Sequence, residues 1–362
     1  MSDKGISVLM DEQRTFPPPE EMKKIAHISS MEQYEEMYKR SVEDPESFWA
    51  EMAEQNISWF KKWDKVLEYD FHKPKIEWFI GGKLNATYNC IDRHLEGERR
   101  NKAAIIWEAD DGSYKTFTYV QLAYEVNRFA NVLKKHGIGK GDRVTLYMPM
   151  IPELAFAMLA CARIGAIHSI VFGGFSAQSL RDRILDCESK CVVTSDKGLR
   201  GGKFNPMKEN CDAALEECPA VEKVFVVQRA AGDVMMKDGR DLWWHEEMAA
   251  EDITADCPPE EMDAEDPLYI LYTSGSTGKP KGVLHTTGGY MVYTNVSFKY
   301  IFDYHEKDVF YCAADIGWVT GHSYIIYGPL SNGATTVMFE GLPTYPNAGR
   351  YWDTIAKHQV NQ

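Results

Sequence analysis

The sequence predicts an α/β fold built from mixed, mostly parallel sheets that are flanked by helices. Between residues 103 and 227, short apolar segments of strand length alternate with longer segments whose apolar residues recur at the helical period. This alternation is typical of parallel strands joined by crossover helices, which bury both faces of the sheet. The chain has 362 residues, of which 44% are hydrophobic and 26% are charged. It is therefore long enough to bury a large core and to contain more than one structural unit.

Residues 1–95 are expected to form a helical extension that packs against the rest of the chain. Pro17-Pro18-Pro19 predicts an extended start, and Ser29-Ser30 predicts the N-terminal cap of a charged amphipathic helix. A second helix is predicted after Asp44-Pro45. It is expected to carry a set of large apolar side chains, namely Phe48, Trp49, Met52, Trp59, Phe60 and Trp63. Because acidic residues surround these rings, we expect them to pack against the main domain and not to stack on nucleic-acid bases.

A hairpin and then an alternating series of helices and strands are predicted next. Asp110-Asp111-Gly112 lies between two strand-like segments and is a hairpin signal. Beyond it, residues 229–266 are polar and acidic, and we expect them to form a surface insertion. The predicted helices span 119–136, 152–164, 176–187 and 206–217, and the predicted strands span 103–107, 115–119, 143–147, 168–172, 190–194, 224–227 and 309–313.

Charge and hydropathy restrict the class of protein. The net charge of −14 argues against general binding to nucleic acid or to anionic membranes, although a local basic cluster can still bind a nucleotide. No apolar run approaches the roughly 18 residues that a membrane-spanning helix needs. The first residues lack the apolar core of a secretory signal, so we expect a cytoplasmic protein.

The eight cysteines show no pattern that indicates disulfides or a metal. None forms a C-x-x-C pair, and no H-E-x-x-H spacing occurs among the ten histidines. Several cysteines lie inside apolar or helical segments, so we expect small buried thiols in a reducing compartment. The sequence predicts no metal site held by protein side chains.

The most informative segment is the loop YTSGSTGKPKGV at residues 272–283, directly after the apolar run 268–271. Glycines allow the backbone to approach an anion closely and to turn its N–H groups toward it. Hydroxyl groups add hydrogen-bond donors, and Lys279 and Lys281 add compact positive charge for phosphate oxygens. The segment therefore predicts a polyphosphate-binding loop between two strands.

Two better-known phosphate loops are excluded by spacing. A P-loop needs G-x-x-x-x-G-K-[ST], but Thr273 stands where the first glycine should be and Pro280 follows Lys279. A dinucleotide-binding turn needs G-x-G-x-x-G between a strand and a helix, whereas the spacing here is G-x-x-G-x-x-x-G. A purely flexible Gly/Ser hairpin is the remaining alternative, and it does not account for two lysines around a stiffening proline.

The loop resembles the signature loop of the adenylate-forming enzymes, the superfamily of acyl-CoA synthetases, luciferases and peptide-synthetase adenylation domains. The resemblance implies that it holds the β- and γ-phosphates of ATP, with Mg²⁺ bridging the phosphates. Lys279 is expected to stabilise phosphate charge during catalysis. The phosphate-binding residues that the resemblance implies are Thr273, Ser274, Gly275, Ser276, Thr277, Gly278 and Lys279.

Further segments are similar to one branch of that superfamily, the AMP-forming acetyl-CoA synthetases. These are SIVFGGFS at 169–176, RGGK at 200–203, ADIGWVTGHSY at 314–324 and FEG at 339–341, and residues 1–95 resemble the helical extension of the family. The resemblance implies two steps: acetate attacks ATP to give acetyl-adenylate and pyrophosphate, and the thiol of coenzyme A then displaces AMP. ATP, acetate and coenzyme A are the expected partners.

The resemblance also implies binding residues for coenzyme A and for the acyl group. The RGGK turn is expected to be cationic with an accessible backbone, and Lys203 replaces an arginine common in the family, which keeps the charge but not the bidentate fork. Thr344 stands where relatives commonly have asparagine. The expected coenzyme A residues are Phe172, Gly173, Gly174, Arg200, Gly201, Gly202, Lys203, Thr320 and Thr344, and the expected acyl-pocket residues are Trp318, Val319 and Thr320. For His322 in the same segment we expect a structural role.

The resemblance implies that residues 96–362 form part of the AMP-binding (adenylation) domain and that the family continues beyond Gln362. The ribose-binding motif, the adenylation lysine and a mobile C-terminal domain are expected in that further sequence, so the 362 residues alone are expected to be inactive. Three hypotheses stay open: an acetyl-CoA synthetase, a synthetase for propionate or another short acid, and a non-catalytic fragment that binds polyphosphate or coenzyme A.

Overall fold

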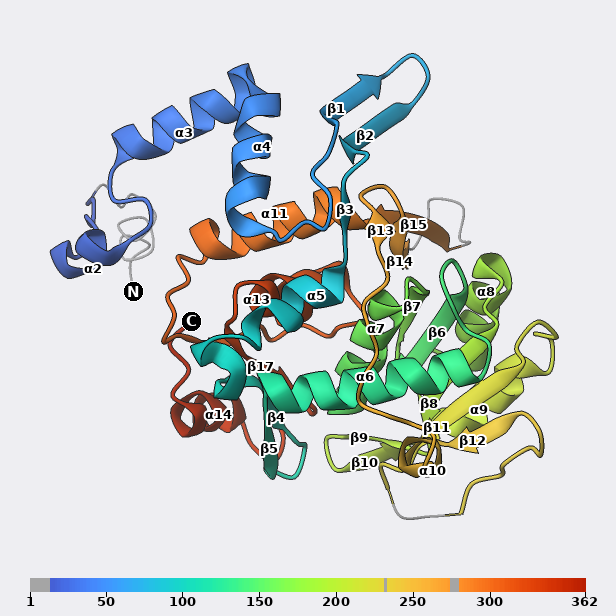
Figure 1. Cartoon of the computed structure of the whole chain (residues 1–362). Helices are drawn as coiled ribbons and strands as arrows, with labels where there is room; N and C mark the ends of the chain where they lie inside the picture. Colours follow the sequence, from blue (N-terminus) through green and yellow to red (C-terminus); the bar gives the residue numbers. More distant parts are fainter. Residues whose placement is uncertain (1–13, 231–232, 274–279) are drawn as a thin grey trace, which may run out of the picture. The chain divides into compact units, whose positions relative to one another are not determined.

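The computed structural model describes residues 14–230, 233–273 and 280–362, and the chain divides into two compact units, Met1–Pro45 and Glu46–Gln362 (Figure 1). The first unit contains helices α2 (Glu20–Ile25) and α3 (Met31–Glu43). The Ser30 hydroxyl accepts a hydrogen bond from the Gln33 backbone N–H at 3.2 Å. This bond satisfies a free N–H of the first helical turn and confirms the predicted cap.

The second unit starts within helix α4 (Pro45–Asn56), which is shorter than the sequence predicted. Phe48 and Met52 are buried on it, but Trp59, Phe60 and Trp63 lie beyond its end, so their predicted place on the helix was wrong. The indole rings of Trp59 and Trp63 instead pack around the buried ring of Phe79, with centroids 5.3 and 5.0 Å from it. Packing of these large rings overrides the helical pattern of the sequence.

A seven-stranded sheet forms the larger part of the second unit, in the order β12-β11-β8-β6-β7-β14-β15. Every neighbouring pair in it is parallel except β14 and β15, which are antiparallel. This confirms the predicted mixed, mostly parallel sheet. The strands are β6 (Arg143–Met148), β7 (Ile167–Phe172), β8 (Cys191–Ser195), β11 (Lys223–Val227), β12 (Asp241–Trp243), β14 (Pro267–Thr273) and β15 (Lys281–Thr286).

Helices cover both faces of this sheet, as Figure 1 shows. Val224 and Val226 of β11 lie in a buried cluster with residues of the helices α8 and α9. Phe225, between them, points to the other face, where its ring meets Phe129 of α6 at 5.6 Å. Alternation of side chains along one strand thus supplies both apolar layers. The helices involved are α6 (Tyr119–Lys135), α7 (Pro152–Arg163), α8 (Ala177–Cys187) and α9 (Met207–Leu215).

A second, four-stranded sheet has the order β16-β17-β4-β5. Its first three strands are parallel, and β4 and β5 form the predicted antiparallel hairpin. The turn of that hairpin is closed by a hydrogen bond from the Ala109 N–H to the Ser113 carbonyl at 2.8 Å. The strands are β4 (Ala103–Glu108), β5 (Tyr114–Thr118), β16 (Val309–Tyr311) and β17 (Thr335–Phe339).

The segment 229–266 is not a surface insertion, and this prediction was wrong. Strand β12 extends the seven-stranded sheet in parallel to β11, and helix α10 (Trp244–Ala249) follows it directly. The ring of Trp244 stacks on Phe129 of α6 with 3.7 Å between the centroids. A short apolar run among acidic residues was enough to join the core, although the composition of the whole segment is polar.

The elements not yet described are short, apart from the long helix α11, which follows β15. The remaining elements are β1 (Lys65–Asp70), β2 (Lys75–Ile80), β3 (Lys83–Leu84), α5 (Ala86–Cys90), η1 (Asp92–His94), η2 (Glu98–Asn101), β9 (Gly198–Arg200), β10 (Lys203–Asn205), β13 (Met262–Asp263), α11 (Thr287–Ile301), α12 (Val319–Gly321), η3 (His322–Tyr327), α13 (Gly328–Ser331) and α14 (Arg350–His358).

The cysteines are buried, as predicted: all eight are free thiols, and only Cys312 is not fully buried. Within the three described ranges, every helix is too short or too polar to span a bilayer.

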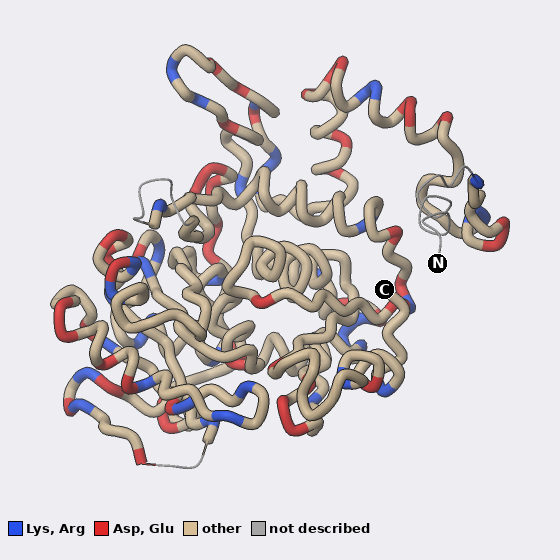
Figure 2. Tube along the Cα trace, turned by 180° about the vertical axis from the view of Figure 1, so that it is seen from behind, with Lys and Arg blue, Asp and Glu red and all other residues tan. Residues whose placement is uncertain are grey.

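Charged residues of both signs are interspersed along the trace (Figure 2). Many form short surface pairs, such as Lys75 with Glu68 at 2.7 Å and Arg181 with Glu217 at 2.7 Å. Exposed pairs of this kind contribute at most about 1 kcal/mol each to the free energy of unfolding.

Candidate functional site

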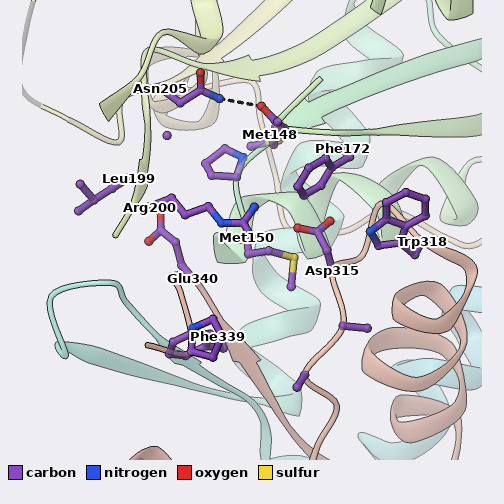
Figure 3. Close-up of a pocket in the computed structure, with 18 of the residues that line it drawn as sticks. Met148, Met150, Phe172, Leu199, Arg200, Asn205, Asp315, Trp318, Phe339 and Glu340 are labelled. Atoms are coloured by element: carbon purple, nitrogen blue, oxygen red, sulfur yellow. Dashed lines mark hydrogen bonds between the residues drawn. The ribbon is translucent and has the colours of Figure 1, made fainter. Parts of the chain in front are cut away.

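A cavity of about 350 Å³ lies where the carboxyl ends of strands from the two sheets meet (Figure 3). Strands β6, β7 and β8 of the larger sheet and β16 and β17 of the smaller sheet all end beside it. In the larger sheet β7 lies on one side of β6, and the next strand in the chain, β8, lies on the other side. Where the strand order reverses in this way, a crevice opens at the carboxyl ends of the strands. The lining residues are Met148, Pro149, Met150, Phe172, Gly173, Gly174, Gly198, Leu199, Arg200, Asn205, Met207, Ala313, Ala314, Asp315, Trp318, Phe339, Glu340, Gly341, Pro343 and Tyr351.

The predicted Phe172-Gly173-Gly174 segment forms one wall of this cavity, at the end of β7. The carbonyl of Gly173 accepts hydrogen bonds from Asn205 Nδ2 at 2.7 Å and from the Tyr147 hydroxyl at 3.2 Å. Figure 3 shows the bond from Asn205 as a dashed line. These bonds tie the wall to the β9–β10 hairpin and to β6.

Arg200 reaches into the cavity from strand β9, and its guanidinium points toward Phe172 and Asp315 (Figure 3). The guanidinium carbon lies 5.4 Å from the centroid of the Phe172 ring, a cation–π distance. Lys203 on β10 is the register partner of Arg200 in the antiparallel pair. Directly opposed residues of such a pair project to the same face, so the two cations belong to one face of the hairpin.

The Gly201-Gly202 turn joins β9 to β10. The sequence predicted that the backbone of this turn is accessible, and this prediction was wrong. The carboxylate of Asp110, which is 2% exposed, accepts the Gly201 N–H at 2.6 Å and the Gly202 N–H at 2.7 Å. Both glycines have positive φ, +62° and +71°, and a Cβ would lie 2.6 Å from Leu342 Cδ1 or 2.5 Å from the Tyr345 hydroxyl. The turn therefore needs glycine for conformation and for space, but its two N–H groups are already used.

Trp318 is the only one of the three predicted acyl-pocket residues that lines this cavity. Trp318 is 50% exposed, and the centroid of its indole ring lies 6.1 Å from that of the Phe172 ring. Val319 and Thr320 begin helix α12 and are exposed outside the cavity lining, and so is Thr344. The structure thus brings Trp318 together with Phe172 and Arg200, and it does not bring the other three into the cavity.

Two carboxyl groups face the same cavity. Burial raises the pKa of Asp315, against the opposing effects of the Gly317 N–H and the positive charge of Arg200. Burial also raises the pKa of Glu340 to about 7, although hydrogen bonds from Arg229 favour its charged form. The cavity therefore combines apolar walls with the cation of Arg200 and with two carboxyl groups whose pKa values are raised by burial.

His322 is fully buried, and burial lowers its pKa to about 4, so the imidazole is neutral near pH 7. Its Nδ1 lies 3.1 Å from the Trp318 carbonyl. This placement agrees with the structural role that the sequence predicted.

The predicted phosphate loop lies between β14 and β15 in the sequence. Thr273 is the last residue of β14, is exposed, and pairs in register with Lys281 at the start of β15. The loop therefore connects two strands, as predicted, and these strands are antiparallel. The predicted residues Ser274, Gly275, Ser276, Thr277, Gly278 and Lys279 lie outside the described residues.

Sequence reasoning missed Asp110, Asn205 and Asp315. The sequence predicts only a turn residue at Asp110, because its hairpin signal accounts for an aspartate without a further role. Asp315 lies within the ADIGWVTGHSY segment, and a carboxylate in that segment is a sequence signal for this side of the cavity. Asn205 lies just beyond the RGGK turn, in a strand that the sequence did not predict.

Comparisons with known proteins extend these observations. The family model described as AMP-binding enzyme matches residues 91–362, and the one described as Acetyl-coenzyme A synthetase N-terminus matches residues 34–90. The acetyl-coenzyme A synthetase of Magnetococcus marinus is 62% identical over 331 residues, which are 91% of this chain and 51% of that protein. The acetyl-coenzyme A synthetase of Halorhodospira halophila and acetyl-coenzyme A synthetase 2 of Pseudomonas aeruginosa are each 57% identical over 353 residues, 97% of this chain and 54% of theirs.

The chain spans about half the length of the curated relatives it matches. The two family models together cover residues 34–362, and the resemblance inferred from the sequence is confirmed. The chain belongs to the AMP-binding enzyme family, within which it matches the N-terminal part of the acetyl-coenzyme A synthetases.

Proposed function

We propose that this chain provides the coenzyme A cavity and the phosphate loop of an AMP-forming acetyl-CoA synthetase. The observation that carries the proposal is the convergence of Phe172, Arg200 and Trp318, from three separate segments, on one cavity. Each of these residues lies in a segment that resembles the acetyl-CoA synthetases, and the chain matches such enzymes at 57–62% identity.

The chemistry of the cavity suits coenzyme A. Its interior is lined largely by uncharged side chains, among them Met148, Met150 and Phe339, which suit the uncharged pantetheine arm. Arg200 and Lys203 are exposed on one face of the β9–β10 hairpin and supply positive charge for the phosphates of the nucleotide end. A wholly cationic cavity would suit the phosphates and not the arm.

For the first step we propose that the 273–279 loop holds the phosphates of ATP. An oxygen of the acetate carboxylate attacks the α-phosphorus, and the bond to the leaving pyrophosphate breaks. The loop sequence contains no carboxylate, the usual protein ligand of Mg²⁺, so Mg²⁺ would be held mainly through the phosphates. When bound, Mg²⁺ neutralises part of the phosphate charge.

For the second step we propose that Phe172, Gly173 and Gly174 hold the arm of coenzyme A so that its sulfur reaches the acyl carbon. The carbon–sulfur bond forms, the bond from the acyl carbon to the AMP oxygen breaks, and the thiol proton is released. Holding the thiol in line with the acyl group is the contribution that these residues make, because orientation alone removes several kcal/mol, up to about 7–11, from such a barrier.

The proposal is tested in a protein that contains these residues together with the remainder of the relatives' length. Acetate-dependent exchange of pyrophosphate into ATP measures the first step, and acetyl-CoA formation measures both. We expect acetate to be preferred over propionate and longer acids, with propionate still used, because one methylene changes discrimination by only about 1–3 kcal/mol. A higher kcat/KM for butyrate than for acetate, or activity without AMP formation, contradicts the proposal.

A further inference from the structure

We propose that Asp110 is a positioning residue for coenzyme A: its carboxylate holds the Gly201-Gly202 turn and thereby places Arg200 over Phe172. The inference rests on the proposed function, since it assigns the residue that prepares the coenzyme A side of the cavity. Asp110 does not line the cavity and is not proposed to touch the ligand.

The geometry of the Asp110 carboxylate supports this role. One oxygen, Oδ1, accepts the Gly201 N–H at 2.6 Å, and the other, Oδ2, accepts the Gly202 N–H at 2.7 Å. Hydrogen bonds to a charged acceptor are short and about twice as strong as neutral ones. Asp110 follows β4 of the smaller sheet, whereas the turn belongs to the β9–β10 hairpin, so the two bonds fasten segments about 90 residues apart in the chain.

Neighbouring side chains also restrict the turn, because they fill the space that a Cβ on either glycine would occupy. A Cβ on Gly201 would meet Leu342, and a Cβ on Gly202 would meet the hydroxyl of Tyr345, each below 3 Å. The segment that follows β17 therefore packs directly on the turn while Asp110 binds its N–H groups. The turn is left with little freedom, and Arg200, the residue directly before it, is placed accordingly.

This arrangement changes how an anionic ligand is recognised at the turn. A phosphate could bind the two N–H groups only by displacing Asp110, which would leave a buried carboxylate without hydrogen bonds. An unsatisfied buried charge is costly. Phosphate recognition therefore falls to the side chains of Arg200 and Lys203, and the glycine turn acts as a rigid support between them.

The test uses the purified chain, with coenzyme A as the probe, in calorimetric titrations of wild type, Asp110→Ala and Asp110→Asn. Asp110→Ala is expected to weaken coenzyme A binding at least about tenfold, because Arg200 is no longer held. Asp110→Asn keeps one acceptor oxygen and should give an intermediate loss. The matched control is Asp111→Asn, because Asp111 is the exposed neighbour and its hydrogen bonds, among the residues that the structure describes, go to Ser113 of its own turn.

Amide hydrogen exchange separates positioning from a general loss of structure. In Asp110→Ala, exchange at Gly201 and Gly202 should rise at least about tenfold while the strands of the larger sheet stay protected. If Asp110→Ala does not fold, the same comparison is made with Asp110→Asn. If wild type binds coenzyme A and the Asp110 variants bind it equally well, the positioning role is overturned and the proposed function stands. If wild type does not bind coenzyme A, the proposed function fails, and this inference fails with it.

Discussion

Arg229 forms a bidentate ion pair with Glu340, with nitrogen–oxygen distances of 2.8–3.1 Å. Arg229 follows β11 of the seven-stranded sheet, and Glu340 follows β17 of the four-stranded sheet. The pair therefore connects the two sheets at the wall of the cavity. Glu340 is buried. Its burial and the nearby Asp110 oppose ionisation of its carboxyl group, whereas Arg229 favours it.

The raised pKa of Glu340 predicts a specific dependence of stability on pH. The pKa of Glu340 is about 7 in the folded state, and its reference value is 4.5. Between pH 4.5 and pH 7 the folded state therefore binds a proton that the unfolded state has lost. Stability is therefore lost as pH rises from about 4.5 to 7, by up to roughly 3 kcal/mol from this group. Denaturant unfolding of wild type and Glu340→Gln across this range should show a smaller decline with pH in the variant. Parallel curves for the two proteins contradict the prediction.

Trp244→Ala should destabilise the second unit by about 3–5 kcal/mol, the usual cost of truncating a large core aromatic. The reason is the stacking of Trp244 on Phe129, which joins the acidic segment to helix α6. Trp352→Ala is the matched control, because Trp352 is 71% exposed and its loss should change the free energy of unfolding by less than about 0.5 kcal/mol. Equal effects of the two substitutions would mean that the segment 229–266 does not contribute to the core.

Glu108→Ala should cost about 3–5 kcal/mol, because it leaves the buried guanidinium of Arg350 without its carboxylate partner. Glu108 is 0% exposed and accepts hydrogen bonds from Arg350 at 2.7 Å, Lys357 at 2.9 Å and His358 at 2.7 Å. These bonds fasten helix α14 to the end of β4. Glu306→Ala is the control: Glu306 also pairs with two cations, Arg99 and Lys102, but is exposed.

The exposed Glu306 pairs should contribute at most about 1 kcal/mol. A loss in Glu108→Ala no larger than that in Glu306→Ala would show that the buried cluster does not hold α14. Urea unfolding, followed by circular dichroism, measures both.

Lys279→Ala should slow acetate-dependent exchange of pyrophosphate into ATP, in a protein of the relatives' full length, by an amount equivalent to about 2–4 kcal/mol. The reason is the loss of positive charge from the phosphate loop that the sequence predicts. Lys307→Ala, an exposed lysine in a loop before β16, is the control and should leave the exchange rate unchanged. Normal exchange in Lys279→Ala would refute the assignment of the loop.

The sequence predicted the elements whose pattern is local. The alternation of apolar strands and amphipathic helices placed β6, β7, β8 and β11 to within one or two residues, because each is buried on both faces. The end of α4 and the joining of β12 to the sheet were not predictable in this way. They depend on packing partners distant in the chain, Phe79 for Trp59 and Phe129 for Trp244.

The candidate site shows the same division. Arg200, Phe172 and Trp318 were recognised by motif, because their segments carry unusual combinations of glycine, aromatic and charged residues. Asp110 was not recognised, because its partner amides at Gly201 and Gly202 are backbone groups that leave no mark in the sequence. Only the fold brings the carboxylate to the turn.

Binding of coenzyme A in the cavity beside Arg200 can be measured by calorimetric titration of the purified chain with coenzyme A. Wild type is predicted to bind, Arg200→Ala to bind at least about tenfold more weakly, and Arg100→Ala, an exposed arginine outside the cavity lining, to match wild type. Absence of binding by wild type, or equal affinity in Arg200→Ala and wild type, would contradict the proposed coenzyme A site.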